Sequence, residues 1–373
     1  MRRVIMRAVL LAPGDQRWSE VLSSTRHDLY HLPGFVELET RWHEPGAPSA
    51  FVATEDDRVF LVPLVVRSIP PAIADGEAWL DATGPRGYPG PIAGPIEAGA
   101  DEAFVERAAV ALAATLREHR IVTAFVRCHP LLSPPPDTLR RVGAIVEHGQ
   151  SVSIDLTRSA DEAWGAMREN HRREITRARR DGYGVRIDES WTRLDEFVAI
   201  YAAAMERLGA AEHWRLPSDY FVDLQTAVGS RVHLFVVEKD GELAAAALLT
   251  EVDGIVEYHL SGTAPEHVAA SPTKLLIEHA SRWARERGNR VFHLGGSLHH
   301  DDSLIHFKLG FSPVRHPVVS WRLIADPDAS RLLTERWGRL GRSPAAPDDG
   351  DADFFPGYRR PARAVLEGSD SDR

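Results

Sequence analysis

The sequence has very little cysteine, with Cys128 as the single one in 373 residues. One thiol forms neither an intramolecular disulfide nor a cysteine-based zinc cage, and this usage fits the reducing cytoplasm. The sequence also lacks an uninterrupted apolar run near the roughly 18 residues that a membrane helix needs. Its formal net charge is −10, unlike that of proteins that coat nucleic acids. These absences predict a cytoplasmic protein with no membrane partner and no metal held by cysteine.

What the sequence does contain is the composition of a folded protein, with 43% hydrophobic and 26% charged residues. Domains average roughly 150 residues, so the length predicts two. We expect a first lobe over residues 1–150 and a second over 151–328. The remainder, 329–373, is expected to be a largely flexible extension, because PAAPDDGDAD and GSDSDR within it are typical of disorder. The apolar stretch 354–358 is expected to dock on the folded body.

The first half is predicted to alternate helices and strands. Its basic start, MRRVIMRAVLLAP, is interrupted by Arg7 and lacks a small-residue cleavage site, so we interpret it as a strand and not as a leader. The other elements expected here are hairpin strands at 51–54 and 59–67, a helix at 101–119 and a strand at 121–127. Residues 81–95 hold too much glycine and proline for regular structure. This alternation indicates an α/β layer arrangement.

The second half repeats a similar order of elements without a sequence repeat. The expected order is a strand at 151–156, a helix at 161–180, a strand at 184–187, a helix at 194–208, three hairpin strands within 232–262, a helix at 272–288, a strand at 290–294, a short helix at 302–309 and a strand at 318–323. The hairpin turns are KDG at 239–241 and DG at 253–254. This order is that of an acyltransferase lobe of the GNAT type.

Several stretches resemble one branch of the GNAT acyltransferase superfamily. They are NHRREITRARR at 170–180, YAAAMERLGAAEHWRLPSDYF at 201–221, LGG at 294–296 and FKLGFSP at 307–313, with GYPGP at 87–91 and FVRCHPLL at 125–132 in the first half. The branch is the Fem-type or BioF2-like one, which includes peptidoglycan aminoacyltransferases and tRNA-dependent enzymes that form amide bonds. The resemblance implies an α/β (α+β) fold of two tandem GNAT-like lobes. Each lobe would be a mixed, mostly antiparallel sheet flanked by helices.

Lys308 is the strongest candidate for a catalytic residue. It lies between Phe307 and Leu309, in a segment whose apolar neighbours are expected to be buried, and a partly buried cation stabilises charge that develops at a reacting carbonyl or on a phosphate. The resemblance implies that Phe307 and Lys308 stand at the donor site. The alternative is a lysine that extends from an amphipathic helix into solvent. Gly310 is read as the C-cap of that helix.

The resemblance also implies residues that bind the acceptor. Arg207 and Tyr220 match positions that line the acceptor groove, where an arginine would hold a carboxylate or phosphate, although a structural pair between helix and loop is an equal alternative. Tyr88, together with Arg127 or His129, would face the same groove from the first half. On a separate strand, Glu257 and His259 alternate with Tyr258. Both would point into the cleft as proton acceptors, or both would be polar residues on a solvated face of the sheet.

The donor is predicted from a motif that is missing. Coenzyme A-dependent relatives hold pyrophosphate with a glycine-rich loop before a helix, whereas SGTAPEHVAASPTKLLIEHA at 261–280 has no such glycine pair. Helix N-terminal amides and Lys274 would still bind a phosphate. Arg173, Arg177 and Arg180 share one helical face, which is either a phosphate contact or a solvated face paired with acidic neighbours. We therefore expect aminoacyl-tRNA as donor, with acyl-CoA as the alternative.

No metal and no tightly bound cofactor is predicted. The cluster His299, His300, Asp301 and Asp302, with His306, is better explained as a loop that caps the following helix, because adjacent histidines point in different directions. The sequence thus predicts an acyltransferase that moves an aminoacyl group from aminoacyl-tRNA to a small-molecule amine or a peptidoglycan precursor. The alternatives are an acyl-CoA-dependent N-acyltransferase and a catalytically silent, ligand-binding GNAT-like protein.

Overall fold

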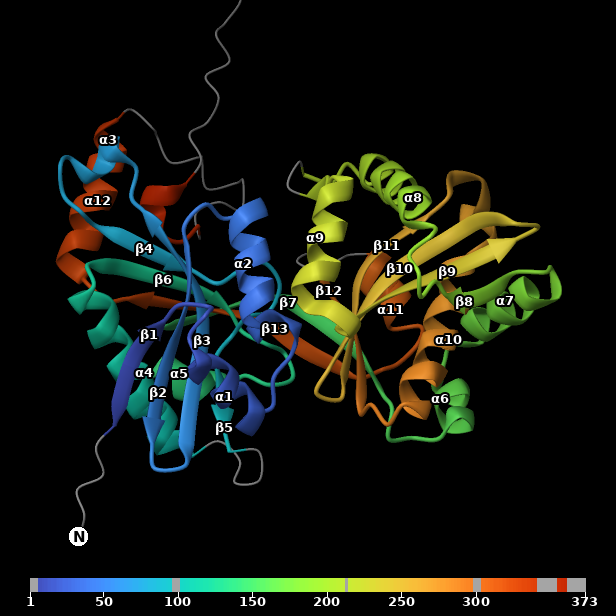
Figure 1. Ribbon diagram of the computed structural model, residues 1–373, viewed down its shortest axis with the longest axis horizontal. Coiled ribbons are helices and arrows are strands. Elements are labelled where there is room, and N and C mark those ends of the chain that lie inside the picture. Colours follow the sequence, from blue (N-terminus) through green and yellow to red (C-terminus); the bar gives the residue numbers. More distant parts are fainter. Residues whose placement is uncertain (1–5, 96–100, 212–213, 298–302, 341–353, 361–373) are drawn as a thin grey trace, which may run out of the picture.

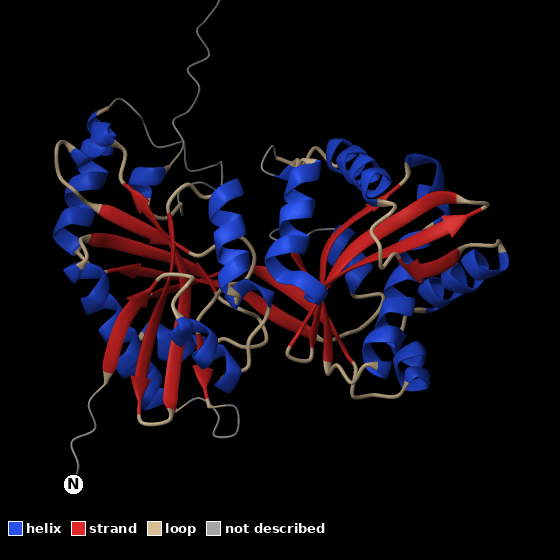
Figure 2. Ribbon diagram, viewed as in Figure 1, coloured by secondary structure: helices blue, strands red, loops and turns tan. Residues whose placement is uncertain are grey.

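The computed structural model describes residues 6–95, 101–211, 214–297, 303–340 and 354–360. Within these residues the strands form one 13-stranded mixed sheet, and Figures 1 and 2 show two halves joined through a narrow middle. The order across the sheet is β1-β2-β3-β4-β6-β13-β7-β12-β11-β10-β9-β8, with β5 paired to β3 at the side. The predicted α/β fold with a mixed, mostly antiparallel sheet is confirmed, and both halves share the one sheet.

The first half contains the predicted elements and some short additional ones. Its strands are β1 (Arg7–Leu11), β2 (Ala47–Glu55), β3 (Arg58–Ser68), β4 (Leu80–Thr83), β5 (Ile92–Gly94) and β6 (Ile121–Arg127). Its helices are α1 (Gln16–Ser24), η1 (Leu29–His31), α2 (Pro33–Trp42), α3 (Pro71–Ala74), α4 (Glu102–Glu118) and α5 (Pro136–Arg140). The expectation of no regular structure over 81–95 was wrong at both ends of that segment, because β4 and β5 each pair with the long strand β3.

The second half follows the predicted order closely. Its strands are β8 (Gly184–Ile187), β9 (Val232–Lys239), β10 (Glu242–Val252), β11 (Ile255–Thr263) and β12 (Val291–Ser297). Its helices are α6 (Ala160–Ala166), α7 (Glu169–Arg180), α8 (Leu194–Arg207), α9 (Ser218–Val228), η3 (Gly229–Arg231), η4 (Pro265–Ala270), α10 (Pro272–Glu286) and α11 (Ser303–Lys308). The single helix predicted over 161–180 is two helices, because Met167 between them is extended and buries its side chain.

Each half repeats one strand order. In the first half β1 to β4 are antiparallel neighbours and β4 pairs in parallel with β6. In the second half β8 to β11 are antiparallel neighbours and β11 pairs in parallel with β12. Two strands cross between the halves: β7 (Ala144–Asp155) pairs with β12, and β13 (Arg315–Ile324) pairs with both β6 and β7. The predicted boundary at residue 150 therefore falls inside a strand, and the division into lobes stays a prediction.

The strands β11 and β12 separate along their length. They pair only over Ile255–Glu257 and Val291–His293, although they continue to Thr263 and Ser297. Beyond the last pair the two facing edges are not bonded to each other. Unpaired strand edges offer backbone N–H and C=O groups to an extended ligand. This divergence follows the pair Glu257 and His293, which fixes where a ligand would enter the sheet.

The core of the second half is packed tightly around β10. The residues from Leu243 to Leu249 are all buried, because α8 and α10 cover the two faces of this strand. A strand covered on both faces is expected to be continuously apolar. Close approach of α8 also explains Gly262 in β11, where an added Cβ would lie 2.8 Å from the backbone nitrogen of Tyr201. The sheet is thus a rigid support for the residues at its divergence.

The C-terminal part of the chain returns to the first half. Helix α12 (Pro327–Arg339) packs beside α3 and β6, and Figure 1 shows it at the far side from α10. Leu333, Trp337 and Tyr358 are buried together. The prediction of a largely flexible extension is therefore wrong for 329–340 and 354–360, and the predicted docking of 354–358 is confirmed by burial of Tyr358. The remaining residues of the extension lie outside the described residues.

Candidate functional site

Lys308 is held at the end of the diverging strand β12. It ends the short helix α11, and its Nζ donates to the carbonyl oxygen of Gly296 at 2.9 Å. The lysine is only 6% exposed, so it does not extend into solvent as a surface lysine would. Phe307 beside it is partly buried against His171 and Phe311. The apolar frame thus fixes an ammonium group beside the end of the sheet.

Glycine is required at three positions around Lys308. An added Cβ on Gly296 would lie 2.9 Å from the Tyr88 hydroxyl and 3.0 Å from the Gln150 carbonyl oxygen, and Gly295 adopts a left-handed φ of 74°. Gly310 was predicted as a helix C-cap, but it is not among the described residues with positive φ. Its Cβ would instead lie 2.2 Å from the ring of His171. Close packing of that histidine explains Gly310.

Glu257 and His293 form a buried acid–imidazole pair at the last rung of the parallel ladder. The two carboxylate oxygens of Glu257 lie 2.8 and 2.9 Å from Nδ1 of His293. Both side chains are at most 1% exposed. Glu257 was predicted to face the cleft, whereas His293 was not predicted. It lies two residues before Gly295, and the alternation of β12 was the sequence signal that places it on the Glu257 side of the sheet.

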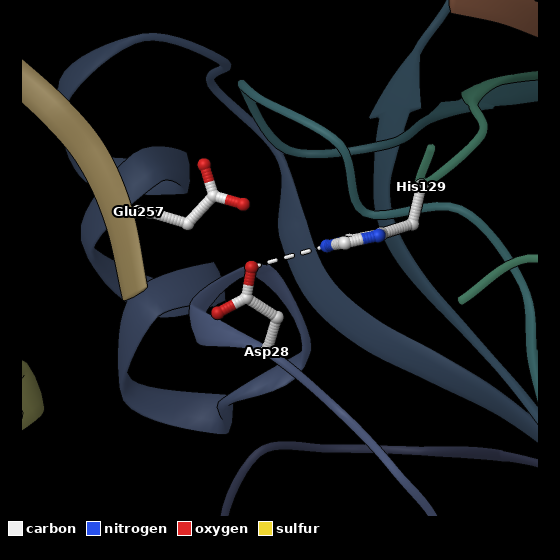
Figure 3. Close-up of side chains that lie close together, drawn as sticks. All are labelled: Asp28, His129 and Glu257. Carbon is white, nitrogen blue, oxygen red and sulfur yellow. Dashed lines mark hydrogen bonds and ion pairs between the residues drawn. The ribbon is translucent and has the colours of Figure 1, made fainter. Parts of the chain in front are cut away.

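Asp28 and His129 bring a second buried pair from the first half. Figure 3 shows the Glu257 carboxylate directed at them from β11, with Asp28 bonded to Nε2 of His129 at 3.0 Å. The ligating atoms of Asp28, His129 and Glu257 lie within 4.8 Å of one another, a spacing that would suit a metal ion. However, the backbone N–H of Leu131 donates to Nδ1 of His129 at 3.1 Å, which leaves the ring proton on Nε2. A protonated nitrogen cannot ligate, so the arrangement fits a shared proton better than a metal.

The two carboxylates have opposite protonation. Burial raises the pKa of Glu257 well above its ordinary value, and the neighbouring charge of Asp28 raises it further. Burial opposes ionisation of Asp28 as well, but the hydrogen bond from His129 helps to outweigh it, and the pKa of Asp28 is lowered. Like charges this close cannot both persist away from water. Glu257 therefore holds the proton that the pair shares, and Asp28 is the anion.

Tyr88 connects this cluster to the lysine. Its hydroxyl accepts from the backbone N–H of Gly296 at 3.0 Å, on the residue whose carbonyl oxygen accepts from Lys308. Burial raises the pKa of Tyr88 to about 12, while the charge of Arg127 opposes this rise. Tyr88 therefore stays neutral. The predicted residue His129 lies beside Glu257, Tyr88 is connected to Lys308 through Gly296, and Arg127 is near enough for its charge to act on Tyr88.

His259 lies on the same face of β11 as Glu257. Burial lowers the pKa of His259 to about 4, with Arg86 as the next cause, so its ring is neutral. Its Nε2 is buried without a hydrogen-bond partner among the described residues, and its ring packs against Phe35 at 6.1 Å. A buried polar atom without a partner costs free energy unless a ligand or water meets it. His259 is thus a candidate for contact with a substrate.

Arg207 and Tyr220 were predicted to line the acceptor groove or, alternatively, to form a structural pair, and within the described part of the chain no contact joins them. Arg207 is exposed at the end of α8, whereas Tyr220 is fully buried and bonded to Glu39 at 2.8 Å. The arginine that contacts Tyr220 is Arg86, at 2.8 Å, in the loop before GYPGP. Arg86 also lies over the ring of Trp214, and its Nη1 has no partner among the described residues. The sequence signal was the arginine directly before the GYPGP motif.

The predicted donor arginines line a groove of about 780 Å³. Arg173, Arg177 and Arg180 of α7 face it, and Ser271 at the start of α10 closes its far side. Lys274 is not free for a phosphate, because its Nζ is bonded to Glu174 at 2.6 Å and packs over the Phe307 ring. The groove therefore adjoins the Lys308 helix. Of the predicted loop cluster, 299–302 lie outside the described residues, and His306 contacts Arg168 at 2.7 Å.

Comparisons with known proteins identify a known domain in the second half of the chain. Residues 165–308 match the family described as an acetyltransferase (GNAT) domain. A segment of 138 residues is 30% identical to the UDP-N-acetylmuramoylpentapeptide-lysine N(6)-alanyltransferase of Weissella viridescens. That segment covers 36% of this chain, and it spans only 40% of the length of that relative.

Solved structures share the fold over most of the chain. FemX has a TM-score of 0.67 at 14% identity, over 87% of this chain and 99% of that one. The L-PGS of Bacillus licheniformis has a TM-score of 0.52 at 11% identity, over 89% and 98% of the two chains. Among the described residues, no helix is long and apolar enough to span a membrane. The chain thus contains a GNAT acyltransferase domain over residues 165–308 and a segment similar to a Fem-type alanyltransferase, and it shares the fold of FemX.

Proposed function

We propose that this protein is an acyltransferase that moves an aminoacyl group from aminoacyl-tRNA to an amine and so forms an amide bond. The observation that carries the proposal is the ammonium group of Lys308, fixed on Gly296 where β11 and β12 diverge and coupled to a buried carboxyl pair. The 30% identical segment shared with an alanyltransferase supports the nature of the transferred group. A cytoplasmic location follows, since aminoacyl-tRNA is a cytoplasmic molecule.

The reaction exchanges an ester bond for an amide bond. The nitrogen of the acceptor amine attacks the carbonyl carbon of the aminoacyl ester, a C–N bond forms, and the ester C–O bond breaks. The leaving 3′ hydroxyl oxygen gains one proton. An acceptor that begins as an ammonium loses two protons in forming the amide, so each turnover releases one proton. Negative charge develops on the carbonyl oxygen and then on the leaving oxygen, and a fixed cation stabilises both.

The chain supplies groups for each of these needs. Lys308 stabilises the developing negative charge from a site with little water, where a charge acts strongly. Phe307 packs beside it and holds the donor end in place. Glu257 gives its proton to the leaving oxygen and regains one from the attacking amine, since a raised pKa suits an acid that works near neutral pH. His259 offers a neutral nitrogen to the acceptor on the same face of β11.

The groove along α7 is the proposed site for the phosphates of the donor. Arg173, Arg177 and Arg180 supply positive charge on one wall, and Arg172 stands beside them. Contacts of this kind neutralise backbone phosphates without reading sequence. From the groove, Phe307 and Lys308 are reached past Lys274, which packs on the Phe307 ring. An aminoacyl-tRNA end laid in the groove thereby has its ester directed at the lysine.

The acceptor is proposed to enter from the side of the first half. Tyr88, Arg127 and His129 border the reacting residues there. One guanidinium nitrogen of Arg86 has no partner within the described part of the chain, and the charge of Arg86 acts on His259. A carboxylate or phosphate of the acceptor would be held between the two, and a peptidoglycan precursor and a small amino-acid-like natural product both carry such groups. Arg86 thus takes the role that the sequence assigned to Arg207.

A second candidate is acyl-CoA-dependent N-acylation at the same residues. The observation in its favour is that the α10 N-terminus borders the arginine groove, a position suited to a pyrophosphate. Against it, residues 264–271 form the short helix η4 and a left-handed Ser271, and they contain no glycine. A catalytically silent binding protein is the third candidate, but it would gain nothing from a costly buried acid pair.

The test uses both donors with one preparation of protein. Purified protein is incubated with aminoacyl-tRNA labelled in the aminoacyl group, or with labelled acetyl-CoA, and with amines that do or do not carry a carboxylate. Labelled amide is expected with aminoacyl-tRNA and with the anionic acceptors. Amide formation with acetyl-CoA alone would overturn the donor. Binding of either donor without product would favour the silent protein.

A further inference from the structure

A row of polar side chains crosses four adjacent strands beside the reacting residues. Glu257 of β11 is paired with His293 of β12, and His293 with Ser153 of β7. Ser151, two residues before Ser153, is paired with His316 of β13. Directly paired residues, and residues two apart in a strand, point to the same face of a sheet. All five side chains therefore lie on one face.

A hydrogen bond lies at each end of this row. Glu257 lies 2.8 Å from Nδ1 of His293, and the Ser153 hydroxyl lies 2.8 Å from Nε2 of His316. Between these contacts, Nε2 of His293 is buried with no partner among the described residues, and so is the hydroxyl of Ser151. The rings of His293 and His316 are 6.5 Å apart. Because Ser153 stands directly opposite His293 in the ladder, its hydroxyl is the group of this row that can turn between the two rings.

The row leads from the interior toward solvent. Glu257, His293 and Ser153 are at most 3% exposed, whereas His316 is only half-buried. Groups deep in the interior cannot exchange protons with bulk water directly. A side chain that both accepts and donates, such as imidazole or hydroxyl, passes a proton on without keeping a charge. The side chains of this row are of that type.

We propose that His293, Ser153 and His316 conduct protons between the buried Glu257 carboxyl and solvent. Glu257 gives its proton to Nδ1 of His293 while Nε2 of that ring passes one to the Ser153 hydroxyl, which in turn passes its own to Nε2 of His316. Return of the proton reverses these transfers. The catalytic consequence rests on the proposed function, in which each turnover must dispose of one proton. The conduction itself does not depend on it.

The charges around the row favour this role. Burial lowers the pKa of His293 and of His316, so both rings are neutral at rest. Lys308 adds to this effect on His293. A resting imidazolium would block transfer from Glu257, since it has no free nitrogen. Burial and the charge of Lys308 thus keep the ring of His293 neutral and able to accept a proton.

The first experiment measures conduction without any substrate. In protein labelled with ¹⁵N-histidine, the exchange of the His293 ring N–H with water is followed by NMR saturation transfer. His316→Gln and Ser153→Ala are expected to slow it at least about tenfold. Glutamine can keep the bond to Ser153 but cannot relay a proton. The matched control is His148→Gln, which changes another histidine bonded to a serine, Ser320, between the same two strands.

The second experiment supplies a proton carrier from solution in place of the His316 ring. In His316→Ala, added imidazole is expected to restore both the exchange of His293 and, with aminoacyl-tRNA and acceptor, the rate of transfer. Unchanged exchange in His316→Gln, or no recovery with imidazole while thermal unfolding stays normal, would overturn the route. Wild-type protein that exchanges as expected but transfers no aminoacyl group would overturn the proposed function and leave the route standing.

Discussion

The parallel pair β4–β6 in the first half and the parallel pair β11–β12 in the second have equivalent places in the sheet but different side chains. The first pair is built from Leu80 with Ile121, Ala82 with Ala124 and Thr83 with Phe125. The second begins in the same way, with Ile255 opposite Val291 and Val256 opposite Phe292, but ends with Glu257 opposite His293. One architecture therefore carries apolar packing in one half and ionisable groups in the other.

The energy of burial explains why this difference is informative. A buried acid–imidazole pair loses its hydration, and apolar residues of similar volume are often as stable or more stable. The first half demonstrates that the fold accepts apolar residues at this place. Stability alone therefore does not account for Glu257 and His293, which supports the chemical role proposed for them.

In the first half, the C-terminal segment 354–360 covers the parallel pair β4–β6. In the second half, β11 and β12 are not paired beyond Glu257 and His293. The Tyr358 hydroxyl is 2.7 Å from that of Thr123 in β6, and Arg359 is 2.6 Å from the buried Asp81 in β4. The C-terminal segment 354–360 thus bridges the first parallel pair. In the second half the strands diverge next to Lys308, which is why the donor is proposed to bind in this half.

The largest effect is expected when the Glu257 and His293 pair of the second half is replaced by apolar residues like those of the first half. The double substitution Glu257→Leu with His293→Phe is expected to lower turnover at least about 100-fold, because it removes the proton donor and its partner. Its free energy of unfolding is expected to stay equal or to rise by up to about 4 kcal/mol. Turnover and chemical denaturation measured on one preparation check both. A double variant that still turns over at the wild-type rate would deny the pair any role.

The arginine groove tests whether the open half binds a polyanion. Substituting Arg173 and Arg177 with glutamine is expected to raise the KM for aminoacyl-tRNA about tenfold, with kcat unchanged, since these arginines hold phosphates and not the reacting ester. The slope of log affinity against log salt should fall by about 0.7 for each phosphate that is no longer neutralised. The matched control is Arg331→Gln, an exposed arginine on α12. Equal effects of the control would show that overall charge alone matters.

The pH dependence of stability separates the two carboxylates. The raised pKa of Glu257 contributes stability that is complete below its unfolded pKa, about 4.3, and is lost as pH rises through the folded pKa. The lowered pKa of Asp28 acts in the opposite sense, and its contribution is lost as pH falls. Above pH 5 the unfolding free energy of the wild type should therefore fall with pH more steeply than that of Glu257→Gln, by at most about 1.4 kcal/mol per pH unit. Parallel curves would mean that Glu257 is ionised.

The smallest effects are expected when one tyrosine in each half loses its hydroxyl group. Tyr358→Phe loses the bond to Thr123 and is expected to cost about 1 kcal/mol of stability, with turnover unchanged. Tyr88→Phe loses the bond to the Gly296 N–H and is expected to lower turnover, because that residue also holds Lys308. Thermal unfolding and initial rates measured on both variants decide this. A loss of turnover in Tyr358→Phe would contradict the division of roles.

Much of the fold was predictable because local sequence determines it. The turns at Asp240-Gly241 and Asp253-Gly254 adopt positive φ at both residues, and so fix the hairpins on either side of β10. The proline at 272 and the apolar periodicity after it define α10. These signals lie within a few residues of the structure they produce.

The site was predictable only in part, because its contacts join distant segments. Glu257 was predicted from the alternation of side chains along its strand, and Lys308 from the resemblance to Fem-type enzymes. Asp28 and His293 were missed, since alternation places His293 on one face of the sheet without revealing its partner, and nothing near Asp28 in the sequence indicates His129. Arg207 was chosen where Arg86 contacts Tyr220, because the order of elements does not reveal which loop packs against α9. The exchange of β7 and β13 between the halves was hidden for the same reason.

The role of Lys308 is tested most directly by the rate of amide formation in a single turnover by Lys308→Met, with donor affinity measured alongside. Methionine keeps the length and apolar contacts of the side chain but removes its charge. We predict a rate about 100-fold or more below the wild type, with the Kd for aminoacyl-tRNA little changed, because the charge acts on the transition state. An unchanged rate would contradict the claim that Lys308 at the open half is the reactive centre.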